Sequence, residues 1–204
     1  ASILALSMVA GAATADIGQP NIKMSNGLNA EHPIGVGTDA MNACLAAGSE
    51  GKVQVTPYWS HALGSEAEAA QALRAGLQEM MIEPPSAHFG IEPALGVFDL
   101  PFLFDGEAAV DGALDGAFGD HIAAKMEPHG LVVLGFWEPG FRHVTNSRAP
   151  IETAADLEGL RIRVMQNKIF LYTFDRLGAN AIPMAWGELF AALETKAVDA
   201  EENP

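Results

Sequence analysis

The first two thirds of the chain alternates between two kinds of apolar pattern. Four short segments have the length and apolar content of β-strands, at residues 21–25, 52–56, 80–82 and 130–136. Three longer segments between them have helical patterning, at residues 35–47, 65–74 and 107–126. Strands that alternate with helices predict an α/β fold with a mostly parallel sheet.

The segment at 130–136 has the longest apolar run among the predicted strands. Leu131, Val132, Val133 and Leu134 follow one another without a polar residue. A continuous run of this kind is typical of a strand that is buried on both faces of a parallel sheet. We therefore expect such a strand here.

The pattern changes after the predicted turn Glu138-Pro139-Gly140. Four basic and seventeen acidic residues precede residue 140, against seven basic and nine acidic residues from there on. A turn after a strand, combined with a shift in charge, is typical of a crossing between two lobes. We predict a first α/β lobe at residues 16–139 and a second lobe at residues 140–204.

The predicted strand at residues 160–164 carries two arginines. It reads Leu-Arg-Ile-Arg-Val, so a period of two places the aliphatic residues on one face and Arg161 and Arg163 on the other. Two arginines on one face are costly if they are buried without partners. We expect Arg161 to face solvent, as we do Arg148 and Arg176. Arg163, near the end of the strand, is the candidate for holding an anion.

Two further residues are candidates for a binding cleft. Glu83 directly follows the predicted strand at 80–82, at the strand end where open α/β sheets place ligand contacts. A solvated loop carboxylate is the alternative. Trp186 is the first residue of an apolar stripe with helical spacing, so it belongs either to the core or to a cleft.

The overall charge narrows the classes of partner. The 204-residue chain carries a net charge of −15 and has a pI of about 4.6. An acidic chain of this kind repels phosphate, so a nucleic acid is not an expected partner. At 49% hydrophobic residues, the chain has enough apolar material for one medium domain or two small lobes.

The first fifteen residues are uncharged, rich in small and apolar residues, and end in Ala-Thr-Ala. This pattern is typical of the end of a secretory signal peptide with its cleavage site. We expect residues 1–15 to be a remnant of such a peptide, and the mature chain to begin near Asp16. A buried N-terminal helix is the alternative, although Gly11 would interrupt it.

The residues that usually carry catalysis or metal binding are scattered. Cys44 is the single cysteine, and the six histidines show no metal-ligand spacing. The stretch Gly35-Val36-Gly37 matches a loose dinucleotide pattern, but no predicted strand runs directly into it. We therefore expect no cofactor and no metal. An enzyme with His143 as acid or base is the rival interpretation, and a lone histidine is more often structural.

The second part of the chain resembles the solute-binding proteins of tripartite ATP-independent periplasmic (TRAP) transporters, which capture C4-dicarboxylates and other organic acids. The matching stretches are Gly140-Phe141-Arg142 with Thr145-Asn146, residues 156–164 (DLEGLRIRV), Leu177-Gly178-Ala179-Asn180, Pro183-Met184-Ala185-Trp186, Glu188-Leu189 and residues 198–204 (VDAEENP). The earlier chain matches more loosely, at residues 61–66 (HALGSE) and 97–102 (VFDLPF).

This resemblance implies a two-lobed periplasmic-binding-protein-like fold of type II, with a hinged cleft and no catalysis. It places the carboxylate-pairing arginine at Arg163, a second arginine contact at Arg142, the ligand-facing asparagine at Asn203, the aromatic cleft residue at Trp186 and a polar contact at Glu83.

The resemblance also implies partners and extent. The implied partners are a small organic acid and the membrane permease of the transporter, with no membrane insertion of the mature chain. The family continues beyond the Asn-Pro pair at 203–204, so the second lobe is expected to be incomplete. A binding lobe of a sensor or of another importer is the alternative function.

Overall fold

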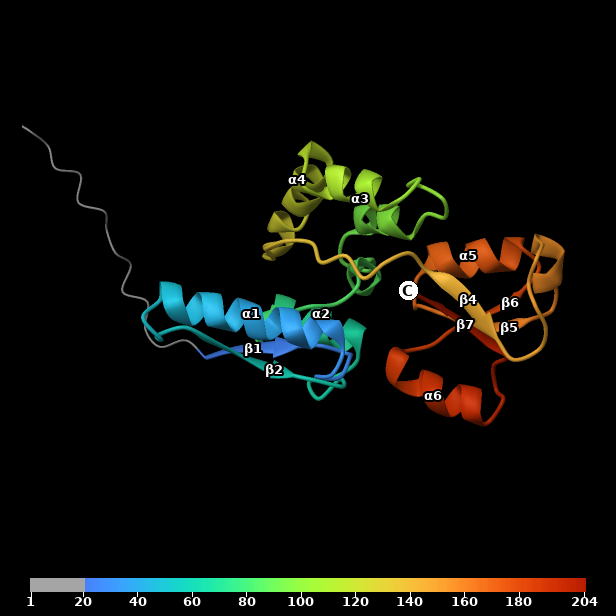
Figure 1. Ribbon diagram of the computed structural model, residues 1–204, viewed down its shortest axis with the longest axis horizontal. Coiled ribbons are helices and arrows are strands. Elements are labelled where there is room, and N and C mark those ends of the chain that lie inside the picture. Colours follow the sequence, from blue (N-terminus) through green and yellow to red (C-terminus); the bar gives the residue numbers. More distant parts are fainter. Residues whose placement is uncertain (1–20) are drawn as a thin grey trace, which may run out of the picture.

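The computed structural model describes residues 21–204, and the predicted signal-peptide remnant at 1–15 lies outside them. Two separate sheets organise these residues (Figure 1). We call the first sheet with helices α1 to α4 the first lobe, and the second sheet with helices α5 and α6 the second lobe. The α/β fold class with mostly parallel sheets is thereby confirmed.

The first sheet has three parallel strands in the order β2-β1-β3. They are β1 (Asn21–Ser25), β2 (Gln54–Tyr58) and β3 (Met80–Met81). The strands predicted at 21–25, 52–56 and 80–82 are thus present, the second of them two residues later in the chain. Helix α1 (Pro33–Gly48) begins at a proline, with the His32 side chain accepting a hydrogen bond from the Ile34 amide.

Local signals set the helices of the first lobe. Helix α2 (Glu66–Arg74) begins with a capping box, in which Ser65 and Glu68 bond each other's backbone amides. The helix predicted at 107–126 is instead two helices, α3 (Glu107–Leu114) and α4 (Ala117–Ala124). The break comes at Gly116, whose extended backbone separates them.

The prediction of a strand at residues 130–136 is wrong. No regular structure covers residues 131–142. Leu131 is buried against the first-lobe core, whereas Val132 and Leu134 are 73% and 78% exposed. The segment lacks regular structure because no strand within residues 21–204 lies beside it to complete its backbone hydrogen bonds. The predicted lobe boundary at residue 139 falls within this irregular segment and stays a prediction.

The second sheet has four strands in the order β4-β7-β5-β6. They are β4 (His143–Asn146), β5 (Arg161–Val164), β6 (Asn180–Pro183) and β7 (Ala200–Asn203). Strands β5, β6 and β7 are parallel, and β4 runs antiparallel to β7 at the edge. Helices α5 (Lys168–Arg176) and α6 (Trp186–Glu194) lie on either side of this sheet (Figure 1).

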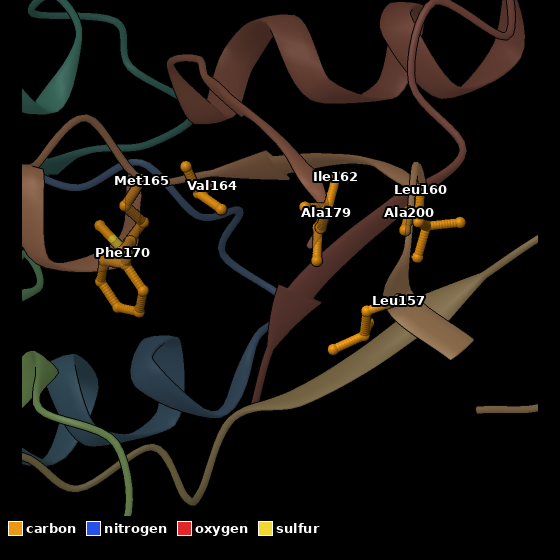
Figure 2. Close-up of a cluster of buried hydrophobic side chains, with 8 residues drawn as sticks. All are labelled: Leu157, Leu160, Ile162, Val164, Met165, Phe170, Ala179 and Ala200. Atoms are coloured by element: carbon orange, nitrogen blue, oxygen red, sulfur yellow. The ribbon is translucent and has the colours of Figure 1, made fainter. Parts of the chain in front are cut away.

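A cluster of buried apolar side chains holds the second lobe together (Figure 2). It contains Leu157, Leu160, Ile162, Val164, Met165, Phe170, Ala179 and Ala200. Ile162 and Val164 are fully buried, as the alternation in 160–164 predicted. Burying a side chain of this size contributes roughly 1.5–3 kcal/mol, so this cluster gives β5 a fixed position.

The glycines at 35 and 37 lie within α1 and serve packing. A Cβ atom on Gly37 would lie 2.7 Å from a ring carbon of Trp137, and one on Gly35 would lie 2.0 Å from the carbonyl oxygen of Ala30. The missing side chains therefore let the indole and the preceding turn approach the helix closely. Of the helices within residues 21–204, none has the length and apolar character needed to cross a bilayer.

Candidate functional site

Arg163 lies on β5 and is 2% exposed. Its neighbours Ile162 and Val164 fill the cluster on one side of the strand, so the arginine points to the opposite side, toward α6. There its guanidinium carbon lies 5.8 Å from the centroid of the Trp186 ring. The structure thus brings these two predicted site residues together, and the strand alternation explains the direction of Arg163. Their role in ligand binding stays a prediction.

The guanidinium of Arg163 is only partly satisfied. Its Nε donates to the carbonyl oxygen of Met184 at 2.9 Å, and its buried Nη1 has no hydrogen-bond partner within residues 21–204. It also forms no ion pair with a carboxylate of the described chain. Burial lowers the pKa of Arg163, while the charges of Glu202 and Glu66 oppose that shift. A guanidinium remains charged under such conditions, so this site holds a buried cation with an unused donor.

A cavity of about 160 Å³ lies beside this arginine, between the two lobes. Glu66, Gln71 and Ser86 line it from the first lobe, and Arg163 and Met184 line it from the second. Because both lobes contribute walls, a molecule in this cavity would contact both at once.

Arg142, directly before β4, is held by the end of β7. Its Nε and Nη2 donate to the carboxylate of Glu202, and Nη2 also donates to the Glu202 carbonyl at 2.7 Å and to Asn203 Oδ1 at 2.9 Å. The antiparallel pairing of His143 with Asn203 brings these residues together. Arg142 also lies over the ring of Phe170, 5.2 Å from its centroid.

Arg142 and Asn203, both predicted as ligand contacts, therefore bind each other in this structure. Glu202 is 2% exposed, and burial raises its pKa although Arg142 opposes the shift. Glu202 carries no local sequence signal, because it lies sixty residues from Arg142 and only the strand pairing brings the two together. A ligand role for Arg142 and Asn203 stays a prediction.

Glu83 follows β3 and belongs to a second polar cluster, with Glu66 and His61. Burial raises the pKa of Glu83 to about 8; the charge of Glu66 adds to the shift and the Gly27 amide opposes it. The Oε1 atom of Glu83 is buried without a hydrogen-bond partner in the described chain. Glu83 is thus mostly protonated at neutral pH, and the alternative of a solvated loop carboxylate is wrong.

His61 connects this cluster to the second lobe. Its Nε2 lies 3.6 Å from Glu66 Oε1 and makes no hydrogen bond within residues 21–204. A Cβ atom on Gly27 would lie 2.3 Å from the same nitrogen, so the glycine makes room for the ring. A Cβ atom on Gly187, at the start of α6, would lie 3.5 Å from His61 Nδ1. The imidazole therefore reaches the helix that begins with Trp186.

Asp99 forms a polar bridge between the lobes that sequence analysis also missed. It accepts hydrogen bonds from Ser86 Oγ and Asn167 Nδ2, both at 2.7 Å. Asn167 is the N-cap of α5 in the second lobe, where its Oδ1 accepts from two backbone amides. Burial raises the pKa of Asp99 to about 6, against the lowering effect of its two hydrogen-bond donors.

The side chains of Arg161 and Arg148 are 39% and 49% exposed, as expected, but both also pair with Asp199. Arg161 donates to both carboxylate oxygens of Asp199 at 2.9 and 2.7 Å, and Arg148 Nη2 lies 2.6 Å from Asp199 Oδ2. These arginines hold the pKa of Asp199 well below its usual range. Both arginines thus stabilise the second lobe through Asp199. Among the described residues of that lobe, Arg163 is buried and has no ion-pair partner.

The profile of a known family, described as bacterial extracellular solute-binding protein, family 7, matches residues 24–204. The chain belongs to this family. The resemblance to TRAP solute-binding proteins inferred from its motifs is thereby confirmed.

Individual relatives bind organic acids of several kinds. The chain is 37% identical over 163 residues to the 2,3-diketo-L-gulonate-binding periplasmic protein of Escherichia coli K12, covering 80% of this chain and 50% of the relative. It is 30% identical over 204 residues to the C4-dicarboxylate-binding periplasmic protein of Vibrio cholerae, covering all of this chain and 61% of the relative.

Solved structures of relatives share the fold. The sugar acid binding protein of Advenella mimigardefordensis in complex with galactonate superposes with a TM-score of 0.89 at 41% identity, covering 93% of this chain and 61% of that one. A TRAP solute-binding protein of Polaromonas bound to D-erythronate gives a TM-score of 0.87 at 33% identity, covering 90% and 60%. The chain thus spans about half to three fifths of the relatives that it matches.

Proposed function

We propose that the chain captures an organic acid between its two lobes, as the extracytoplasmic solute-binding part of a TRAP-type transporter. The observation that carries the proposal is the guanidinium of Arg163, which is 2% exposed and has a donor without a partner. A buried cation without an acidic partner is costly, so it is retained where an anion completes it.

The chemistry of the site fits a carboxylate. A guanidinium presents a planar fork that matches the two oxygens of a carboxylate with parallel hydrogen bonds. The cavity beside Arg163 is lined by both lobes, so binding there removes water from the pair and strengthens it. The proposal includes no catalytic step and no cofactor.

The family supports a proposal about the setting. We propose that the ligand is a small organic acid, that the receiving partner is a membrane permease, and that the protein acts in the periplasm. Relatives described as binding diketogulonate, C4-dicarboxylates, galactonate and erythronate support an acid as the ligand.

A thermal-shift screen of the 204-residue chain against organic acids tests the proposal. A ligand at one hundred times its Kd adds about 2.7 kcal/mol to the free energy of unfolding, which raises the melting temperature measurably. We expect stabilisation by at least one acid, loss of that stabilisation in Arg163→Ala, and its retention in Arg176→Ala, which changes an exposed arginine of α5. Equal stabilisation of both variants would overturn the role of Arg163.

A further inference from the structure

The two lobes meet at a joint between the 3-10 helix η2 (Pro93–Asp99) of the first lobe and the first turn of α5 in the second. Asp99 Oδ2 accepts a hydrogen bond from Asn167 Nδ2 at 2.7 Å, and we call this bond the latch. A Cβ atom on Gly96 would lie 2.6 Å from Cδ1 of Ile169, so the glycine lets α5 pack directly against η2. One polar and one apolar contact therefore hold the joint.

The latch lies outside the Arg163 cavity but is tied to both of its walls. Neither Asp99 nor Asn167 is among the residues that line the cavity. The other oxygen of Asp99 accepts from Ser86 Oγ, which lines the cavity from the first lobe. Gln166, which directly precedes Asn167, lines it from the second lobe. The latch thus fixes the separation of the two walls without any contact to a bound molecule.

The latch has the features of a strong hydrogen bond. Burial raises the pKa of Asp99 to about 6, so this carboxyl is mostly ionised at neutral pH. Hydrogen bonds to an ionised acceptor are roughly twice as strong as those between neutral groups. Asn167 is 6% exposed, so water competes little for its amide. Because both partners belong to the chain, the latch favours the closed arrangement with or without a bound molecule.

We infer that Asp99 and Asn167 are positioning residues, which hold the two lobes together and thereby set the fraction of molecules that is ready to bind. A protein whose binding-competent state is only partly populated binds with an affinity reduced by that fraction. Loss of the latch should therefore weaken binding although no ligand contact changes. The expected effect on affinity rests on the proposed function, whereas the expected effect on lobe separation does not.

The variant Asn167→Asp breaks the latch and keeps the cap of α5. Aspartate is as good an N-cap as asparagine, so its carboxylate still accepts from the Ile169 and Phe170 amides. It has no amide to donate to Asp99, and it brings a second negative charge beside that carboxyl group. Asn180→Asp is the matched control, because it makes the same change at an exposed residue of the second lobe.

Exchanging the two residues should restore the latch. In the double variant Asp99→Asn/Asn167→Asp, the amide at position 99 donates to the carboxylate at position 167, and Ser86 Oγ still donates to the amide oxygen. Two changes that act separately would add their effects, whereas recovery in the double variant requires that the two side chains bond each other.

Lobe separation is measured first, on the 204-residue chain at neutral pH with no acid added. Spin labels on the exposed Cys44 of α1 and on Glu194→Cys at the exposed end of α6 report the distance between the lobes. We expect Asn167→Asp to shift the distances to longer values, the double variant to return them, and Asn180→Asp to leave them unchanged. Unchanged distances in Asn167→Asp, or no return in the double variant, would overturn the inference.

Calorimetry with galactonate, D-erythronate and succinate then measures the effect on binding. For the acid that binds most tightly, we expect Asn167→Asp to weaken binding by about tenfold or more, and the double variant to recover to within about threefold of the unchanged chain. Equal weakening in both variants would contradict the inference. If none of the three acids binds the unchanged chain, the proposed function fails, and the distances still decide whether the latch holds the lobes together.

Discussion

The guanidinium of Arg163 lies over the indole ring of Trp186, with its central carbon 5.8 Å from the ring centroid. A cation over an aromatic face gains about 0.5–2 kcal/mol, most where water is excluded. The carbonyl oxygen of Met184 holds the same group through Nε. Ring and carbonyl together orient the guanidinium before any ligand arrives, so little side-chain freedom remains to be lost on binding.

Replacing Arg163 should remove ligand binding. Arg163→Ala deletes the cation that meets the carboxylate, and we expect a loss of affinity on the order of a hundredfold or more. Arg163→Lys keeps the charge but not the planar fork, so its affinity should fall by about tenfold or more. Calorimetry with the best acid from the screen measures both.

The matched control for this pair is Arg176→Lys on α5, where the arginine is exposed. Its affinity should equal that of the unchanged chain. Unaltered binding in Arg163→Lys would count against a two-bond contact between guanidinium and carboxylate.

Replacing Arg142 should destabilise the second lobe. Arg142→Ala leaves Glu202 buried at 2% exposure without its main partner. Breaking a pair of this kind costs about 3 kcal/mol. Urea unfolding measures it, and the double variant Arg142→Ala/Glu202→Ala should cost less than the two single changes added together.

The same experiment separates the two roles considered for Arg142. Suppose Arg142→Ala unfolds at the same urea concentration as the unchanged chain but no longer binds the acid. Then the main role of Arg142 is to contact the ligand and not to stabilise the buried Glu202.

The bridge at Asp99 should make stability depend on pH. Its pKa is raised from 3.8 to about 6 by burial, so the folded state holds this proton more tightly than the unfolded state. Stability therefore falls as pH rises between about 4 and 6, by on the order of 3 kcal/mol, and this contribution is constant outside that window. Melting temperatures across this range should show a smaller slope in Asp99→Asn than in the unchanged chain. An unchanged slope would mean that other groups dominate.

Ligand affinity should fall at alkaline pH because of Glu83. Burial raises the pKa of this carboxyl to about 8; the charge of Glu66 adds to the shift and the Gly27 amide opposes it. Below that pH the carboxyl is neutral, and above it a second negative charge is added close to Glu66, which lines the cavity. We expect affinity to decrease by about tenfold between pH 7 and 9, and the decrease to be absent in Glu83→Gln. Calorimetry at three pH values measures this, and an identical decrease in the variant would assign the effect elsewhere.

Local signals were sufficient for much of the fold. Ser65 and Glu68 stand at capping-box spacing, and the period of two in 160–164 fixed both the buried face of β5 and the direction of Arg163. Features of this kind depend on residues a few positions apart. The sequence therefore predicted strands β1, β2, β3 and β5 and the start of α2, and it singled out Arg163 as the candidate for the anion site.

Features that depend on distant residues were missed. The apolar run at 131–134 looks like a buried strand, but its regular structure requires a neighbouring strand that residues 21–204 do not place beside it. Glu202 and Asp199 look like surface acids near the chain end, yet β7 carries them into contact with Arg142 and Arg161. Strand pairing of this range leaves no local signal.

Asn167 divides its side chain between the lobes, because Oδ1 starts α5 and Nδ2 holds Asp99. If the lobes move apart and Asp99 is drawn away, the Asn167 side chain is free to rotate. The first turn of α5 then loses the hydrogen bonds that Asn167 Oδ1 accepts from the Ile169 and Phe170 amides. The stability of the first turn of α5 should therefore depend on the separation of the lobes. Hydrogen exchange at the Phe170 amide should then be faster when the lobes are apart than when they are together. This measurement reports lobe separation without a label near the ligand.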